Sequence, residues 1–246
     1  MVSSSIKSSE IRFGECNKQL LEEVIFYGIS LGADFVELFI ENSDNSSVLA
    51  EEDFITSVSP SFGKGAGIRI FKDKRDGFVS TNDLSKHGLM RSVSQAIEML
   101  DISKKTNNLI FEGLKKLKDY SKSKLDWLKE VPTINEVSDK LLLSTKSLKK
   151  DKKVSVRKAS YSRNWQEVII ASSDGTYATD IRLHQTVGLN IITNDAQYRS
   201  NGSRRFGSHG IPNEFRLWDH ESAANEVYES AMNMLYADYV QAGQMP

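Results

Sequence analysis

The chain has 246 residues, 39% of them hydrophobic and 26% charged, and its formal net charge at pH 7 is −1. This length can bury one large core or two smaller ones. A net charge so close to zero provides no overall field that would hold nucleic acid or an anionic membrane, so neither is expected as a partner. Cys16 is the only cysteine, which excludes an intramolecular disulfide and a metal cluster built from cysteines.

The N-terminus and the hydropathy of the chain predict a soluble, cytoplasmic protein. Residues 1–7 contain no apolar signal region, and no stretch approaches the ~20 apolar residues that span a bilayer. The single cysteine fits a reducing compartment.

The first hundred residues predict a helix, antiparallel strands and a second helix. Apolar residues recur at helical spacing over 21–31, and Gly32 follows where a helix commonly ends in a left-handed residue. The apolar period then becomes two, which predicts a turn at 42–45 and strands at 35–41, 48–58 and 66–70. Asn82 or Asp83 is expected to cap the second helix, whose apolar stripe is Leu89, Val93, Ala96, Ile97 and Leu100.

Residues 132–246 predict a second strand-rich region. Thr133 and Glu136 have the spacing of a capping box at the start of a helix. Ser162–Asn164 and Asp174-Gly175 are turn signals that predict two hairpins. One long strand is predicted by the alternation of Tyr177, Thr179, Ile181, Leu183, Val187, Leu189 and Ile191. A loop with one edge strand follows, and then a final helix whose buried face comprises Ala224, Val227, Tyr228, Ala231 and Leu235.

Together these elements predict an α+β fold of largely antiparallel sheets flanked by helices and divided into two subdomains. Residues 1–103 form the first α+β subdomain, 104–131 an irregular Lys-rich connection, and 132–246 the second, strand-rich subdomain. The lysines of the connection would suit a nucleic-acid surface, but the segment lacks the interleaved aromatic residues of a stacking platform. A solvated surface is therefore the preferred interpretation.

No catalytic or metal-binding residue is predicted in this chain. His220-Glu221 resembles the start of a zinc-binding helix motif, but Ala224 and Asn225 stand where the second histidine would have to lie. The four histidines are dispersed, and no two are spaced as a metal pair: His87, His184, His209 and His220. A nucleophile elbow of the GxSxG form is absent from the sequence. Cys16 is close to a helix start, which favours a thiolate, but an inert thiol is preferred because it has no evident histidine partner.

Three glycines alternate along the predicted strand near residue 66, so that one face of the strand carries no side chains. These are Gly63, Gly65 and Gly67. They lack the Gly-Lys-Ser/Thr ending of a phosphate-binding loop. Close packing of the sheet is one explanation for them, and docking of a peptide or partner is the other. The three glycines are therefore the candidate peptide-binding residues.

Four stretches, in their order and separation, resemble the TldD/PmbA family. They are Gly32-Ala33-Asp34 with Val36-Glu37, Gly65-Ala66-Gly67-Ile68-Arg69, Gly77-Phe78-Val79-Ser80-Thr81-Asn82-Asp83-Leu84, and Ser172-Ser173-Asp174-Gly175. The resemblance runs from about Leu20 to Pro246. The ending Gly243-Gln244-Met245-Pro246 is more similar to the TldD side of the family than to the PmbA/TldE side, whose members lack the metal ligands.

The resemblance implies a zinc-dependent peptidase in which two related subunits pair around an internal channel and cleave unfolded peptides. The family also carries the label "modulator of DNA gyrase". Its HExxxH helix follows a GxMP segment, so the resemblance implies that this chain stops before the metal-binding C-terminal domain. On this view the chain holds no cofactor itself, zinc belongs to the full-length parent, and no catalytic residue can be transferred to it.

Two hypotheses follow. In the first, the chain is the N-terminal region of a TldD-like metallopeptidase and supplies scaffold, channel wall and a peptide-docking surface, with a related family subunit and an unfolded peptide as partners in a homo- or heterodimer. In the second, it belongs to a non-catalytic PmbA/TldE-like partner or peptide-binding subunit. An HExxxH motif soon after Pro246 in the gene would favour the first. Nucleic-acid binding through the lysines is a third, weaker alternative, and it predicts steeply salt-dependent binding.

Overall fold

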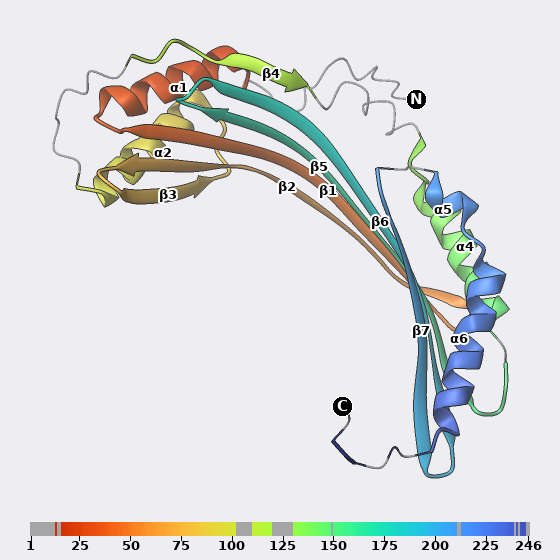
Figure 1. The fold of residues 1–246 in the computed structure, drawn as a ribbon. Helices are drawn as coiled ribbons and strands as arrows, with labels where there is room; N and C mark the ends of the chain where they lie inside the picture. Colours follow the sequence, from red (N-terminus) through yellow and green to blue (C-terminus); the bar gives the residue numbers. More distant parts are fainter. Residues whose placement is uncertain are drawn as a thin grey trace. The chain divides into compact units, whose positions relative to one another are not determined.

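The computed structural model describes residues 13, 16–101, 110–119, 130–148, 150–210, 213–238, 240 and 242–244. Helices and strands both contribute to them, which confirms the predicted α+β class (Figure 1). In chain order they are α1 (Lys18–Ser30), β1 (Phe35–Glu51), β2 (Phe54–Lys72), β3 (Arg75–Thr81), α2 (Lys86–Met99), β4 (Lys115–Asp119), α4 (Ile134–Ser147), β5 (Val154–Ser172), β6 (Thr176–Asp195), β7 (Tyr198–His209), α5 (Glu214–Leu217) and α6 (His220–Leu235).

The described strands form a seven-stranded sheet with the order β3-β2-β1-β5-β6-β4, and β7 also pairs with β6. β3 pairs antiparallel with β2 from Ala66↔Thr81 to Lys72↔Arg75. β7 pairs antiparallel with β6 over twelve residue pairs. The short β4 is parallel to β6.

The chain divides into two compact units, and four strands contribute to both. Unit 1 comprises 1–44, 62–128 and 165–182, and unit 2 comprises 45–61, 129–164 and 183–246. β1, β2, β5 and β6 are 17 to 20 residues long, and each gives one stretch to each unit. Most of the 104–131 connection lies outside the described residues, and the division into subdomains on either side of it stays a prediction.

In unit 1, α1 and α2 pack together against the strands (Figure 1). Asn17 caps α1 by accepting a hydrogen bond from the Leu20 N–H at 3.0 Å. Gly32 follows the helix with φ 102°, as its position predicted. The predicted cap of α2 at Asn82 or Asp83 is wrong. Ser85 caps this helix, while Asp83 accepts hydrogen bonds from the Ser85 N–H and hydroxyl, which stabilise the turn before the helix.

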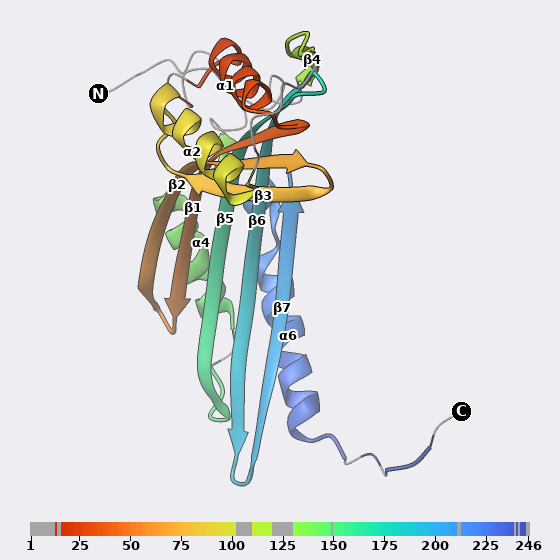
Figure 2. The ribbon, with the colours of Figure 1, turned by 90° about the vertical axis from the view of Figure 1, so that its left-hand side faces the viewer.

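In unit 2, α4 and α6 lie on the same side of the strands (Figure 2). The predicted capping box is confirmed, because Thr133 and Glu136 exchange hydrogen bonds at the start of α4. α6 comes so close to β7 that a Cβ at Gly202 would lie 2.2 Å from the Val227 carbonyl oxygen. Glycine is therefore required where the helix backbone meets the strand.

The turns predicted at 42–45 and 162–164 are wrong, because β1 and β5 run through both segments without interruption. Among the polar side chains that suggested turns, Ser43 donates a hydrogen bond to the Gly63 carbonyl on β2 at 3.4 Å. Asn164 donates a hydrogen bond to Asn45, so two expected turn residues pair with each other. The chain reverses after β1 at Glu52, which has φ 54°, and after β5 at Gly175, which has φ 95° and confirms the Asp-Gly turn.

Candidate peptide-docking groove

The three candidate glycines lie together in β2 and line a shallow hollow of about 330 Å³ within unit 1. The lining comes from three neighbouring strands and the turn after β3. We call this hollow the glycine groove, and its lining residues are Phe39, Glu41, Ser43, Gly63, Lys64, Gly65, Ala66, Gly67, Phe78, Ser80, Thr81 and Asn82.

The glycine groove lies on the face of the strands opposite to the helices. Ala66, Ile68 and Ile70 are buried in the core that contains α1 and α2. Since successive residues of a strand point to opposite faces, Gly65 and Gly67 lie on the other face. The absence of three side chains along one strand leaves the hollow there.

The glycines also have a packing role within the sheet. A Cβ at Gly65 would lie 3.0 Å from the Thr81 carbonyl oxygen, and one at Gly67 would lie 3.0 Å from the Phe78 ring. At Gly63, a Cβ would lie 2.7 Å from the Ser43 hydroxyl oxygen. These neighbours belong to adjacent strands and not to the helices, so the close packing that the glycines allow is between strands.

The glycine groove lies where the pairing between β2 and β3 ends. The last pair is Ala66↔Thr81, and among the described strands only β1 and β3 neighbour β2. Residues 62–65 of unit 1 therefore have one strand edge that no described strand covers. An open strand edge is a surface on which an extended peptide can add as a further strand.

The groove combines one acidic side chain with an exposed aromatic ring. Glu41 lies on the groove face of β1, whereas Lys64 stands between Gly63 and Gly65 and so has its side chain on the opposite face, near Cys16. Phe78 is 58% exposed and gives the groove an apolar wall. A peptide can therefore contact the open strand edge and the Phe78 ring.

Cys16 is buried in the core of unit 1, and its burial raises the pKa of the thiol to about 11, an effect that the nearby Lys64 ammonium partly offsets. The thiol is therefore protonated at neutral pH. This agrees with the interpretation of Cys16 as an inert residue.

The described residues bring together no group of three or more His, Cys, Asp or Glu side chains that could hold a metal ion. His220 and Glu221 lie in the first turn of α6, which Asp219 caps. The prediction that the histidines are dispersed is wrong for one pair. His184 and His209 lie opposite each other on β6 and β7, with 3.2 Å between their Nδ1 atoms. They are equidistant from the turn between these strands, a signal that sequence reasoning missed.

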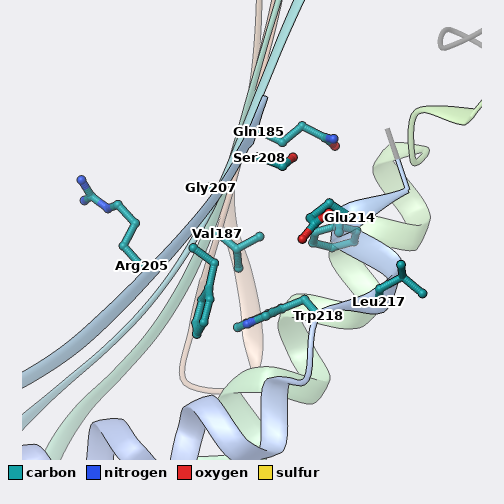
Figure 3. A pocket seen from close by; sticks show the side chains of 10 residues that line it. Gln185, Val187, Arg205, Gly207, Ser208, Glu214, Leu217 and Trp218 are labelled. Atoms are coloured by element: carbon teal, nitrogen blue, oxygen red, sulfur yellow. The ribbon is translucent and has the colours of Figure 1, made fainter. Parts of the chain in front are cut away.

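Sequence reasoning also missed a pocket of about 360 Å³ in unit 2, between β6, β7 and α5 (Figure 3). Val187, Gln185 and Ser208 point into it from the sheet, whereas Arg205 points away. Gln185 accepts a hydrogen bond from the Tyr161 hydroxyl at 2.9 Å, and burial raises the pKa of Tyr161 to about 12. The other residues that line this pocket are Phe206, Gly207, Glu214, Phe215, Leu217 and Trp218.

Among the described residues, no helix combines the length and apolar character that crossing a membrane requires.

Comparison with known proteins gives the same family over both halves of the chain. Residues 36–100 match the PmbA/TldA metallopeptidase domain 1, and residues 124–235 match the PmbA/TldA metallopeptidase central domain. The chain is 24% identical over 227 residues to a metalloprotease TldD homolog of Haemophilus influenzae, covering 87% of this chain and 45% of the relative. A metalloprotease TldD homolog of Buchnera aphidicola is 25% identical over 199 residues, which are 77% of this chain and 39% of the relative. The chain thus spans about half the length of the curated relatives it matches.

Solved structures share the fold. A Bacteroides thetaiotaomicron protein that carries the label of a modulator of DNA gyrase aligns with a TM-score of 0.74 at 17% identity, covering 94% of this chain and 53% of its own. TldE from Thermococcus kodakarensis aligns with a TM-score of 0.67 at 18% identity, and the alignment covers 87% of this chain and 47% of TldE. The two matched domains together cover more than half of the sequence. The chain therefore belongs to the PmbA/TldD metallopeptidase family.

Proposed function

We propose that this chain supplies the first and central domains of a TldD-like zinc-dependent metallopeptidase, and that its glycine groove holds part of an unfolded peptide substrate. The observation that carries the proposal is the position of Gly63, Gly65 and Gly67 beside an open edge of β2. Family membership supports the peptidase, and the groove supports the docking role.

A peptidase that accepts unfolded chains of varied sequence must hold them mainly through the peptide backbone. Addition of a strand to a sheet edge achieves this, because the main-chain hydrogen bonds do not depend on the peptide's side chains. In the groove, the missing side chains of the glycines leave room for those of the peptide. The exposed Phe78 ring offers a contact to apolar side chains of the peptide.

The family implies zinc, and the described residues do not fit a catalytic zinc site. Such a site needs three protein ligands and one open position. The described part of the chain gathers no set of three ligand side chains. No catalytic step is therefore assigned to these residues, and the chemistry is proposed to belong to the part of the protein that follows them.

Replacement of Phe78 by alanine in the complete gene product tests the docking role. Phe78 lines the groove and is more than half exposed, so its loss should cost little stability. We expect KM for a flexible peptide to rise about tenfold with little change in kcat, which corresponds to a contact worth ~1.4 kcal/mol. Phe54→Ala is the matched control, because Phe54 is also exposed on β2 but lies in unit 2. Unchanged KM in a folded Phe78→Ala protein would reject the groove as a docking site.

The second candidate is a non-catalytic TldE-like subunit that pairs with a metal-bearing relative. Its support is the fold shared with TldE from Thermococcus kodakarensis and the lack of three clustered ligands in the described residues. The gene sequence beyond residue 246 separates the two candidates. An HExxxH motif there, with chelator-sensitive peptide hydrolysis by the purified protein alone, supports the enzyme. Activity that appears only after mixing with a TldD-like subunit supports the partner.

A further inference from the structure

We propose that His184 and His209 form a binding site for a single transition-metal ion such as Zn²⁺ or Ni²⁺, with both imidazoles as ligands and water in the remaining positions. The proposal is independent of peptide docking. It rests on the geometry of one cross-strand pair in unit 2.

The two Nδ1 atoms already have the separation that a metal ion requires. They lie 3.2 Å apart, and the ring centroids lie 4.4 Å apart. Zinc binds imidazole nitrogen at about 2.0–2.1 Å with tetrahedral angles, which places two such nitrogens about 3.3 Å from each other. In the neutral pair, one nitrogen shares its proton with the other. When a metal ion binds, that proton moves to Nε2 of the same ring, so that both imidazoles stay neutral and each Nδ1 gives a lone pair to the metal.

The sheet holds the two histidines in this register. His184↔His209 is the first of the residue pairs between β6 and β7, and the ladder continues without a break to Asp195↔Tyr198. Beyond the pair, the Gly210 N–H donates to the Leu183 carbonyl at 2.9 Å. Both backbones are thereby fixed, so that metal binding needs only small rotations of the rings. Preorganised ligands lose less conformational entropy on binding.

The donor set indicates the class of ion and its strength of binding. Imidazole nitrogen suits zinc, copper and nickel, whereas magnesium and calcium prefer oxygen ligands. Both side chains are exposed, so an ion reaches them from solvent. With two protein ligands and water in the other positions, the ion should exchange readily. It would join the last residue of β7 to β6, and so stabilise the folded hairpin in proportion to the free metal concentration.

Metal titration of the full, tag-free chain after chelator treatment tests the site. We use ZnCl₂ and NiCl₂ separately and follow binding by calorimetry, together with the thermal shift of the protein. One ion per chain is expected. His184→Asn and His209→Asn should each lower the affinity at least about tenfold, because chelation by two linked ligands is lost.

His87→Asn and His220→Asn are the matched controls, since each replaces a histidine outside the pair. They should bind the ion as the parent chain does. Far-UV circular dichroism and melting without metal check that the four variants are folded; both members of the pair are exposed, so little stability should be lost. The proposal is overturned if the parent chain binds neither ion. It is also overturned if the double variant His184→Asn/His209→Asn binds the ion with the same affinity as the parent chain. Neither readout depends on peptide turnover.

Discussion

Arg157 on β5 and Glu52 in the turn after β1 are joined by hydrogen bonds that involve both their side chains and their backbones. The Arg157 Nε donates to Glu52 Oε2 at 2.9 Å, and the Arg157 backbone N–H donates to Oε1 of the same carboxylate at 3.0 Å. The Glu52 N–H in turn donates to the Arg157 carbonyl at 2.9 Å. The guanidinium also donates to the Thr145 carbonyl at 2.9 Å, which joins the turn to α4. All of these residues belong to unit 2.

Replacement of Glu52 by glutamine should destabilise the protein by about 2 kcal/mol. The Arg157 side chain is only 6% exposed, so loss of the Glu52 carboxylate leaves a buried charge whose remaining ion pair is the longer one with Asp53, at 3.7 Å. The expected loss of stability is smaller than for a fully buried ion pair, because Glu52 is 43% exposed. Urea unfolding measures it. The control is Glu51→Gln, which removes an exposed pair with Lys158 at 3.1 Å and should cost less than about 0.5 kcal/mol. Equal effects of the two substitutions would contradict this account.

Gly202→Ala should destabilise the protein by about 3 kcal/mol, because the added Cβ would force α6 away from β7. It would lie 2.2 Å from the Val227 carbonyl oxygen and 2.8 Å from the Ala231 Cβ. Gly207→Ala on the same strand is the control, since its nearest neighbour would be 3.5 Å away. We expect the control to lie within about 0.5 kcal/mol of the parent chain in thermal or urea unfolding. A Gly202→Ala protein as stable as Gly207→Ala would show that the helix does not approach the strand this closely.

Substitutions in the glycine groove should change stability by different amounts, depending on which atoms the added side chain contacts. Gly65→Val places a side chain against the Thr81 carbonyl oxygen, which belongs to the backbone and cannot move aside, so the melting temperature should fall. Gly67→Ala meets only the ring of Phe78, which is largely exposed and can rotate away. Its stability should be close to that of the parent chain.

Gly67→Ala is therefore the cleaner probe of peptide docking. If a peptide enters the groove, turnover by the complete gene product should fall while the melting temperature is retained. Adding Phe78→Ala to Gly67→Ala relieves the contact between ring and methyl group, but it should not restore turnover. Normal turnover by a well-folded Gly67→Ala protein would oppose docking at this position.

The stability of the chain should decrease between about pH 9 and pH 11 because of Cys16. Burial raises the pKa of this thiol to about 11 in the folded protein, above the ~8.5 of a free cysteine. In this window the unfolded chain loses the proton while the folded chain keeps it, so rising pH favours unfolding. Cys16→Ala should remove this part of the pH dependence. A thiol reagent at pH 8 should react slowly with the native chain and rapidly after denaturation, and fast reaction with the native chain would refute the burial.

The sequence correctly predicted the features that depend on contacts between residues close together in the chain. The Thr133–Glu136 capping box, the left-handed Gly32 and the Asp174-Gly175 turn each depend on atoms a few residues apart, and all three are present. The alternation after Tyr177 likewise matches β6, because period-two burial belongs to a single strand. The family resemblance rested on short stretches of this kind, and the matched domains confirm it.

Only the tertiary structure decided which polar residues turn the chain and which pair across it. Asn45 and Asn164 are of a residue type that is common in turns, yet both lie in strands, where Asn164 donates a hydrogen bond to Asn45, 119 residues away in sequence. The bare face of the glycines could be read from their spacing. The walls that make it a groove come from β1 and β3, and His184 meets His209 only through the register of β6 and β7. Contacts between residues far apart in sequence depend on strand pairing, which no local period specifies.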